Sequence, residues 1–173
     1  GTGKTPLIIE LVKYLQQQGH KPGVVSRGYG GVATYPYLLD QNSQASASGD
    51  EPLLIYRATQ CAVCVAPDRV AAALILIAQG CTHILSDDGL QHYRLGRSLE
   101  IAVVDGQRLF GNQKLLPVGP LREPVSRLKS VDLIVLNSRS KKAVLSGYHN
   151  IHDMKIQPLA WRKLATLQEL PLA

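Results

Sequence analysis

The chain has 173 residues, of which 45% are hydrophobic and 18% charged, with a formal net charge of +6. This length and composition predict a globular protein with a sizeable core and exclude a disordered chain. The positive charge suits a nucleotide, a phosphorylated lipid or an acidic membrane surface, whereas scattered basic residues and only 5% aromatics argue against nucleic acid as a partner.

The first third of the chain predicts a helix, a short strand and two loops. Residues 7–18 carry apolar side chains at helical spacing, and Gly19 is suited to end that helix. Residues 23–26 form a short apolar run, followed by a glycine-rich loop at residues 28–31. Residues 41–49 are polar and rich in Ser and Ala, which predicts a surface loop.

The middle of the chain alternates short apolar runs with helical patterns. Asp50 is a candidate cap for a helix over residues 51–59, and Asp68 for an alanine-rich helix over residues 69–79. The predicted strands cover residues 62–66, 83–86, 101–105 and 133–137. This order predicts an α/β fold of the P-loop NTPase type, with a mostly parallel sheet and helices on both faces.

We expect residues 1–146 to form the core of the protein and residues 147–173 to begin a further portion, which includes room for a late strand. The chain contains no apolar run near the roughly 20 residues of a membrane span and no signal peptide. It begins inside a motif and without an initiator methionine, so we expect it to be a piece of a longer protein.

The segment Gly-Thr-Gly-Lys-Thr at residues 1–5 matches the second half of a P-loop. In a P-loop, glycine N–H groups and the N-terminus of the following helix bind phosphate. Lys4 would reach the β- and γ-phosphates and the Thr5 hydroxyl would bind Mg²⁺. The candidate nucleotide-binding residues are Gly1, Thr2, Gly3, Lys4 and Thr5.

An acidic pair, Asp87 and Asp88, follows the apolar run at residues 83–86. The carboxyl end of a strand is where a P-loop enzyme holds its second Mg²⁺ contact, so we interpret Asp87 as a metal ligand with Thr5. The second carboxylate is then available to the acceptor. The competing interpretation is an ordinary turn.

Three further kinds of residue are candidates for chemistry. His92 follows the acidic pair, and four arginines lie near Gly or Pro turns, where a guanidinium can stabilise a moving phosphoryl group. Those arginines are Arg27, Arg69, Arg122 and Arg127. Asp50 lies at a loop–helix junction, where a carboxylate can act as general base, although the pattern alone favours a helix cap.

Cys61 and Cys64 form a Cys-x-x-Cys motif. One interpretation is a redox or zinc pair, and the other is part of a buried strand over residues 61–66. We favour the strand, because no second pair or His cluster stands at zinc spacing and free cysteine behaves as a small hydrophobe.

Six segments together resemble the tetraacyldisaccharide 4'-kinase family, the lipid A 4'-kinases of Gram-negative bacteria. The segments keep their order and spacing over most of residues 1–137. They are Gly-Thr-Gly-Lys-Thr-Pro at 1–6, Lys-Pro-Gly-Val-Val-Ser-Arg-Gly-Tyr-Gly-Gly at 21–31, Gly-Asp-Glu-Pro at 49–52, Ala-Pro-Asp-Arg at 66–69, Ser-Asp-Asp-Gly-Leu-Gln-His at 86–92 and Leu-Leu-Pro-Val-Gly-Pro-Leu-Arg-Glu-Pro at 115–124.

The resemblance implies ATP- and Mg²⁺-dependent phosphorylation of the 4'-hydroxyl of an acylated glucosamine disaccharide 1-phosphate, at the cytoplasmic face of the inner membrane. The product would be lipid IVA, a lipid A precursor. By the same resemblance, Asp50 matches the general base, and Asp87 and Asp88 are the acidic pair near the transferred phosphate. The other matched active-site positions are Arg69, His92, Arg122 and Glu123.

Two departures from the family pattern and one alternative accompany this interpretation. The family's N-terminal hydrophobic helix and first P-loop residues are missing here, as is a C-terminal His that pairs with the base, so we expect this piece alone to be inactive. The alternative is a non-catalytic P-loop switch or assembly ATPase, which shares the nucleotide site but needs no base and no acceptor site.

Overall fold

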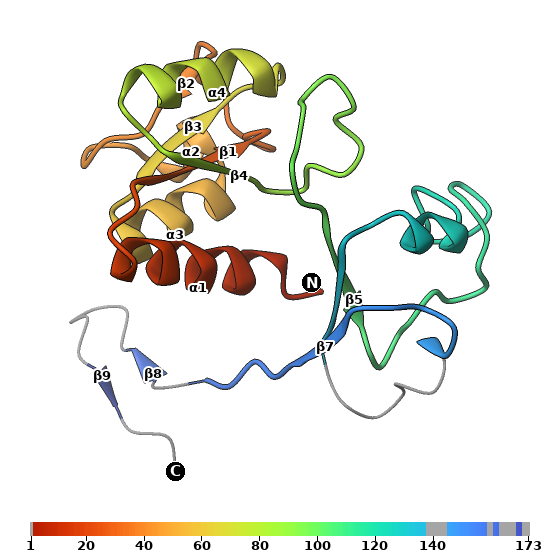
Figure 1. Cartoon of the computed structure of the whole chain (residues 1–173). Coiled ribbons are helices and arrows are strands. Elements are labelled where there is room, and N and C mark those ends of the chain that lie inside the picture. Colours follow the sequence, from red (N-terminus) through yellow and green to blue (C-terminus); the bar gives the residue numbers. More distant parts are fainter. Residues whose placement is uncertain (1, 138–144, 159–160, 163–168, 171–173) are drawn as a thin grey trace. The chain divides into compact units, whose positions relative to one another are not determined.

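The computed structural model describes residues 2–137, 145–158, 161–162 and 169–170. The chain divides into two compact units, residues 3–100 and residues 101–173, with Thr2 grouped with the second (Figure 1). The boundary predicted after residue 146 stays a prediction.

The first unit contains a four-stranded sheet in the order β2-β3-β1-β4. Strand β1 (Pro22–Ser26) lies between β3 (Ala62–Val65) and β4 (His83–Ser86) and is parallel to both. The short strand β2 (Tyr37–Leu38) is antiparallel to β3. The predicted strands in this unit are therefore confirmed to within one residue at each end, as is the mostly parallel sheet.

Helices cover both faces of this sheet. Helices α1 (Lys4–Gln17) and α3 (Asp50–Thr59) lie on one face, and α4 (Arg69–Ala78) lies on the other (Figure 1). Helix α4 begins at the predicted cap, where Asp68 Oδ1 accepts hydrogen bonds from the N–H groups of Val70 and Ala71 at 3.0 and 3.4 Å. The prediction of an α/β fold with helices on both faces is confirmed.

Successive residues of the strands point into two separate cores. Val24 of β1 packs into the core formed with α1 and α3, whereas Val25 packs into the core formed with α4. In β3, Val63 and Cys64 alternate in the same way. The strands are apolar on both sides for this reason. Cys64 lies in β3 and Cys61 directly precedes it, and both are buried, which confirms the interpretation of the Cys-x-x-Cys motif as part of a buried strand segment.

The expected cap at Asp50 is wrong. Asp50 is the first residue of α3, and the N-cap is Gly49, whose φ of +87° lies in the region that favours glycine. A Cβ at Gly49 would approach the carbonyl oxygen of Tyr29 to 2.6 Å, so this close approach also requires glycine. Asp50 and Glu51 are both in the first turn, where their negative charges complement the helix dipole.

The polar segment expected to be a loop contains the short helix α2 (Ala45–Ser48). Its alanines favour helix, and its backbone accepts hydrogen bonds from the two residues that follow the glycine-rich loop. The N–H groups of Val32 and Ala33 donate to the carbonyls of Ser46 and Ala47, at 3.0 and 3.2 Å. The segment therefore packs against the chain instead of remaining a free loop.

The second unit has a parallel three-stranded sheet in the order β5-β6-β7. Its strands β5 (Ile101–Asp105) and β6 (Leu133–Asn137) have the predicted bounds, and β7 (Ile151–Met154) is the late strand expected after residue 147. The 3-10 helix η1 (Val125–Lys129) precedes β6, and β8 (Trp161–Arg162) pairs antiparallel with β9 (Glu169–Leu170). The buried residues Val104, Ile134, Leu136 and Leu145 form the core of this unit.

Among the helices that the structure describes, none is both long and apolar enough to cross a membrane.

Two leucines of α4 provide a matched test of the first unit's packing. Leu76 is 0% exposed and Leu74 is 61% exposed. We predict that Leu76→Ala lowers the free energy of unfolding by about 2–5 kcal/mol because it leaves a cavity. Leu74→Ala should change it by no more than about 0.5 kcal/mol. Urea unfolding measures both values, and equal losses would contradict the assignment of Leu76 to the core.

Candidate active site

The arrangement of strands around β1 defines where a ligand can bind in the first unit. After β3, the chain crosses by way of α4 to β4, which lies on the other side of β1. Ligands of open α/β sheets bind at the carboxyl ends of the strands where such a reversal occurs. Asp87 is at this end, and its N–H donates to the carbonyl of Val25 at 2.9 Å.

The N-terminus of α1 has the form of a phosphate-binding turn. Gly3 is the N-cap, with a left-handed φ of +100°, and Lys4 and Thr5 open the helix. Thr5 is buried. The first N–H groups of a helix and its positive dipole end attract anions, so the turn is suited to phosphate.

The other two predicted phosphate-loop residues, Gly1 and Thr2, contribute less to the description of this turn. Gly1 lies outside the described residues. Thr2 is grouped with the second unit, and its buried hydroxyl has no hydrogen-bond partner in the described part of the chain.

Lys4 and the acidic pair meet in the structure. Lys4 Nζ lies 3.5 Å from Asp88 Oδ1, and the two side chains are 42% and 40% exposed. An exposed ion pair of this kind contributes little to stability. Its importance is positional, because it brings the lysine of the predicted phosphate loop to the carboxylate at the end of β4.

Asp87 has an unusual environment for a carboxylate. It is 1% exposed, and its Oδ1 has no hydrogen-bond partner among the described residues. Burial is the main cause that raises its pKa to about 6, with help from the negative charges of Glu51 and Asp88, against the opposing effects of Lys4 and of the Asp88 N–H. A buried carboxylate with a free oxygen is a candidate ligand for a cation or a proton.

Arg69 is buried beneath the acidic pair. Its Nη2 donates to the carbonyl oxygens of Asp87 and Asp88, at 3.1 and 3.3 Å, and its Nε is buried without a partner among the described residues. Burial lowers the pKa of Arg69, while the charges of Asp88 and Asp87 oppose that effect and the charge of Arg27 adds to it. Arg69 therefore holds the loop through its backbone.

His92 also belongs to this cluster. Its Nε2 accepts a hydrogen bond from the N–H of Arg69 at 3.4 Å, and its Nδ1 is buried without a partner in the part of the chain described. The buried Ser86 hydroxyl is similarly unpaired. Several buried polar atoms without partners around one loop indicate a place that a polar ligand completes.

Sequence reasoning selected Asp50 at the start of α3 and missed Glu51. Both residues are exposed, but Glu51 has the second-largest effect on the pKa of Asp87. The signal that was available is the position of Glu51 in the first turn of a helix, next to a candidate base. The role of Asp50 stays a prediction.

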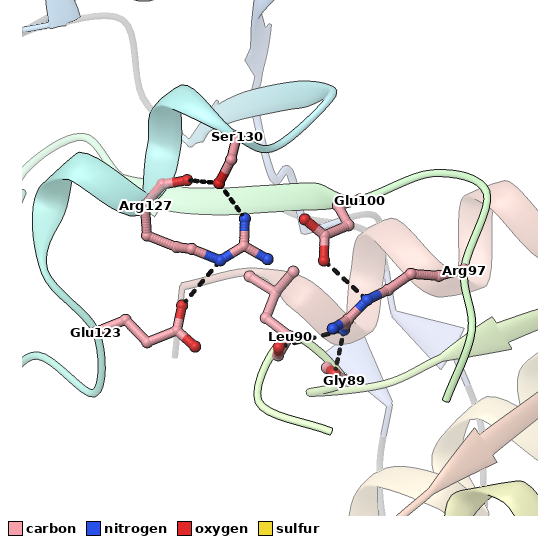
Figure 2. A network of polar contacts seen from close by, with 7 residues as sticks. All are labelled: Gly89, Leu90, Arg97, Glu100, Glu123, Arg127 and Ser130. Carbon is pink, nitrogen blue, oxygen red and sulfur yellow. Dashed lines mark hydrogen bonds and ion pairs between the residues drawn. The ribbon is translucent and has the colours of Figure 1, made fainter. Parts of the chain in front are cut away.

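Arg122 and Glu123 belong to the second unit. Glu123 Oε2 lies 3.3 Å from Arg127 Nε, and Arg127 Nη1 donates to Ser130 Oγ at 2.6 Å (Figure 2). Arg127, noted in the sequence as one of four arginines near turns, thus fixes the carboxylate next to Arg122. The roles predicted for Arg122 and Glu123 stay predictions.

Within the described residues, no three His, Cys, Asp or Glu side chains gather into a metal-binding group. The hard oxygen atoms offered by Thr5 and Asp87 suit a small divalent cation that keeps water and phosphate ligands.

The fold and this site define an α/β protein of the P-loop class: a glycine-capped helix begins with a lysine, and that lysine faces an acidic pair at the end of a parallel strand. A family model described as tetraacyldisaccharide-1-P 4'-kinase matches residues 1–173. The chain belongs to this family, and the resemblance carried by the six sequence segments is confirmed.

Curated relatives agree with the family model. The chain is 56% identical over 141 residues to the tetraacyldisaccharide 4'-kinase of Colwellia psychrerythraea, a match that covers 81% of this chain and 41% of that protein. It is 52% identical over 157 residues to the tetraacyldisaccharide 4'-kinase of Nitrosococcus oceani, a match that covers 90% of this chain and 46% of that protein. It is 48% identical over 171 residues to the tetraacyldisaccharide 4'-kinase of Hahella chejuensis, a match that covers 98% of this chain and 49% of that protein. The chain thus spans about half the length of the curated relatives it matches. No solved structure shows significant similarity to it.

The raised pKa of Asp87 predicts a stability that depends on pH. The pKa is about 6 in the folded protein and about 4 in an unfolded chain, so the folded state holds the proton more tightly. Stability is then lost as the pH rises from about 4 through 6, and ionisation costs on the order of 3 kcal/mol.

We predict that Asp87→Asn removes this cost. Urea unfolding should show the variant to be more stable than the wild type at pH 8, by up to about 3 kcal/mol, with little difference at pH 4. If the variant were more stable than the wild type by the same amount at pH 4 and pH 8, or no more stable at pH 8, the raised pKa of Asp87 would be contradicted.

Proposed function

We propose that the protein containing this chain transfers the γ-phosphoryl group of ATP to the 4'-hydroxyl of a tetraacylated glucosamine disaccharide 1-phosphate, which gives lipid IVA in lipid A biosynthesis. The observation that carries the proposal is the contact of Lys4 with Asp88, next to a buried oxygen of Asp87 that has no partner among the residues described. Membership of the family adds the acceptor, because the relatives carry the name tetraacyldisaccharide 4'-kinase.

In this proposal the N-terminus of α1 binds the phosphates of ATP. The glycine at the N-cap leaves the first N–H groups of the helix open to an anion. Lys4 exchanges Asp88 for the β- and γ-phosphates and balances the negative charge on the group that moves.

The proposal includes Mg²⁺, held by Thr5 and Asp87. The fit rests on the chemistry of the donors: a hydroxyl in the first turn of α1, and a buried carboxylate oxygen with no hydrogen-bond partner in the described ranges of the chain. When bound, Mg²⁺ supplies positive charge to the phosphates. A bound cation would also favour the ionised form of Asp87, because opposite charge offsets the cost of burial.

The proposed reaction is an in-line displacement. The 4'-hydroxyl oxygen forms a bond to the γ-phosphorus as the bond from that phosphorus to the β–γ bridging oxygen breaks, so ADP leaves. Asp50 takes the hydroxyl proton as general base. We assign Asp88, His92, Arg122 and Glu123 to contacts with the phosphate or the acceptor, and Arg69 to holding the loop of the acidic pair.

The proposed place of action is the cytoplasmic face of the bacterial inner membrane, where the lipid substrate lies. The formal net charge of +6 supports attraction to anionic lipid and to phosphate groups.

The deciding assay supplies the full-length protein with labelled ATP and the disaccharide 1-phosphate. We expect a lipid with two phosphate groups as the product. ATP hydrolysis without a phosphorylated lipid would contradict the kinase proposal and favour the alternative, a P-loop switch or assembly ATPase.

We predict that Lys4→Ala lowers kcat/KM for ATP about a hundredfold or more, because a charge that stabilises the moving phosphoryl group is lost. Lys13→Ala is the matched control on the same helix, since Lys13 pairs with Glu10 at 3.0 Å on an exposed surface and should keep the wild-type value. Equal losses in the two variants would point to helix stability as the cause.

We predict that Asp50→Asn lowers kcat about a hundredfold or more while ATP affinity stays within about threefold, because the base acts only in proton transfer. Steady-state kinetics and equilibrium ATP binding separate the two effects. Turnover like that of the wild type would remove Asp50 from the role of base.

A further inference from the structure

Four successive carbonyl groups follow β4, and each accepts a hydrogen bond from an arginine. Arg69 donates to the carbonyls of Asp87 and Asp88. Arg97 donates through Nη1 to the carbonyls of Gly89 and Leu90, at 2.9 and 3.2 Å (Figure 2). The whole backbone turn that carries the acidic pair is therefore held by two guanidinium groups.

Arg97 is itself fixed on its other sides. Its Nε lies 2.8 Å from Glu100 Oε1, and the two side chains are only 24% and 13% exposed. Its guanidinium carbon stands 5.8 Å from the centre of the Tyr93 ring, within the range of a cation–π contact. A planar fork that is oriented in advance loses little entropy when it donates to two carbonyls.

The loop needs such a support because its own geometry is irregular. Asp88 has a φ of +50°, a conformation uncommon for residues other than glycine. The carbonyl of Gly89 also accepts from the N–H of His92 at 2.9 Å. Arg97 thus acts at the point where the turn from the acidic pair to His92 closes.

We propose that Arg97 is a positioning residue for the reaction: through the carbonyls of Gly89 and Leu90 it holds Asp87, Asp88 and His92 in the geometry that phosphoryl transfer requires. The inference rests on the proposed function, and it assigns to Arg97 no contact with ATP or the acceptor. A displacement of about 1 Å at a reacting group can cost about a hundredfold in rate, so a support of the backbone suffices for a large effect.

Lysine cannot replace Arg97 in this role. The ion pair with Glu100 uses Nε, while the carbonyls use Nη1. An ammonium group is a single point of charge, so it can keep the ion pair or reach the carbonyls but does not span both. Arg97→Lys therefore keeps the positive charge at this position and removes the planar guanidinium, so the variant tests the two contributions separately.

The test compares Arg97→Ala and Arg97→Lys in the full-length protein with the control Arg94→Ala. Arg94 lies in the same loop, and its side chain is 77% exposed and contacts Asp68 at 3.5 Å, a pair expected to contribute little. For both Arg97 variants we expect kcat to fall about ten- to a hundredfold, with KM for ATP within about threefold. The control should remain like the wild type.

Two readouts distinguish positioning from general stability. Amide hydrogen exchange of residues 87–92 should rise about tenfold or more in Arg97→Ala, with α1 and α3 unchanged. Guanidinium ion, added far below denaturing concentrations, should restore part of the lost kcat in Arg97→Ala and none in the control.

Wild-type kcat and exchange in Arg97→Ala would overturn the proposal. So would faster exchange throughout the protein together with a lower Tm and no rescue by guanidinium, because Arg97 would then be a residue of general stability. If the wild-type protein phosphorylates no lipid, the proposed function fails, and the exchange comparison still decides whether Arg97 holds the acidic loop.

Discussion

A buried carboxylate is costly when one of its oxygens lacks a hydrogen-bond partner, and Asp87 Oδ1 has none within the part of the chain that the structure describes. The residue follows directly on β4, and its N–H continues the ladder to Val25 of β1, so the sheet itself determines where the carboxylate lies. Burial and the neighbouring charges of Glu51 and Asp88 raise its pKa to about 6. The surroundings therefore favour a proton or a cation at this point, and the sheet, the N-terminus of α1 and the loop after β4 all meet there.

Much of this framework follows from short-range features of the sequence. Apolar strands with residues of both faces buried, such as β1 and β3, require helices on both sides, and the helix signals at Gly19 and Asp68 mark where the chain reverses. The half P-loop and the acidic pair each carry local chemistry, which made Lys4 and Asp88 predictable as candidates. Their contact is a property of the sheet, because the residues are far apart in sequence.

The features that the sequence did not reveal depend on approach between distant segments. Gly49 is the N-cap of α3 and passes close to the carbonyl of Tyr29, and no local pattern encodes that approach. The position of Glu51 next to a candidate base is visible in the sequence, but its effect on the pKa of Asp87 depends on the approach of two segments that are distant in the chain. Arg97 could not be predicted because it binds backbone carbonyl groups. Every residue has a carbonyl group, so no pattern of residue types indicates such a contact.

The ion pair between Lys4 and Asp88 has a consequence for occupancy. Lys4 and Asp88 form an ion pair, so an anion that binds Lys4 must displace a carboxylate. A singly charged anion offers the lysine little more than Asp88 already does, whereas a triphosphate offers several charges and the N–H groups of α1 in addition. In the proposed reaction, Asp88 would then be released beside the bound phosphates, so that filling the anion site and freeing a carboxylate would be one event.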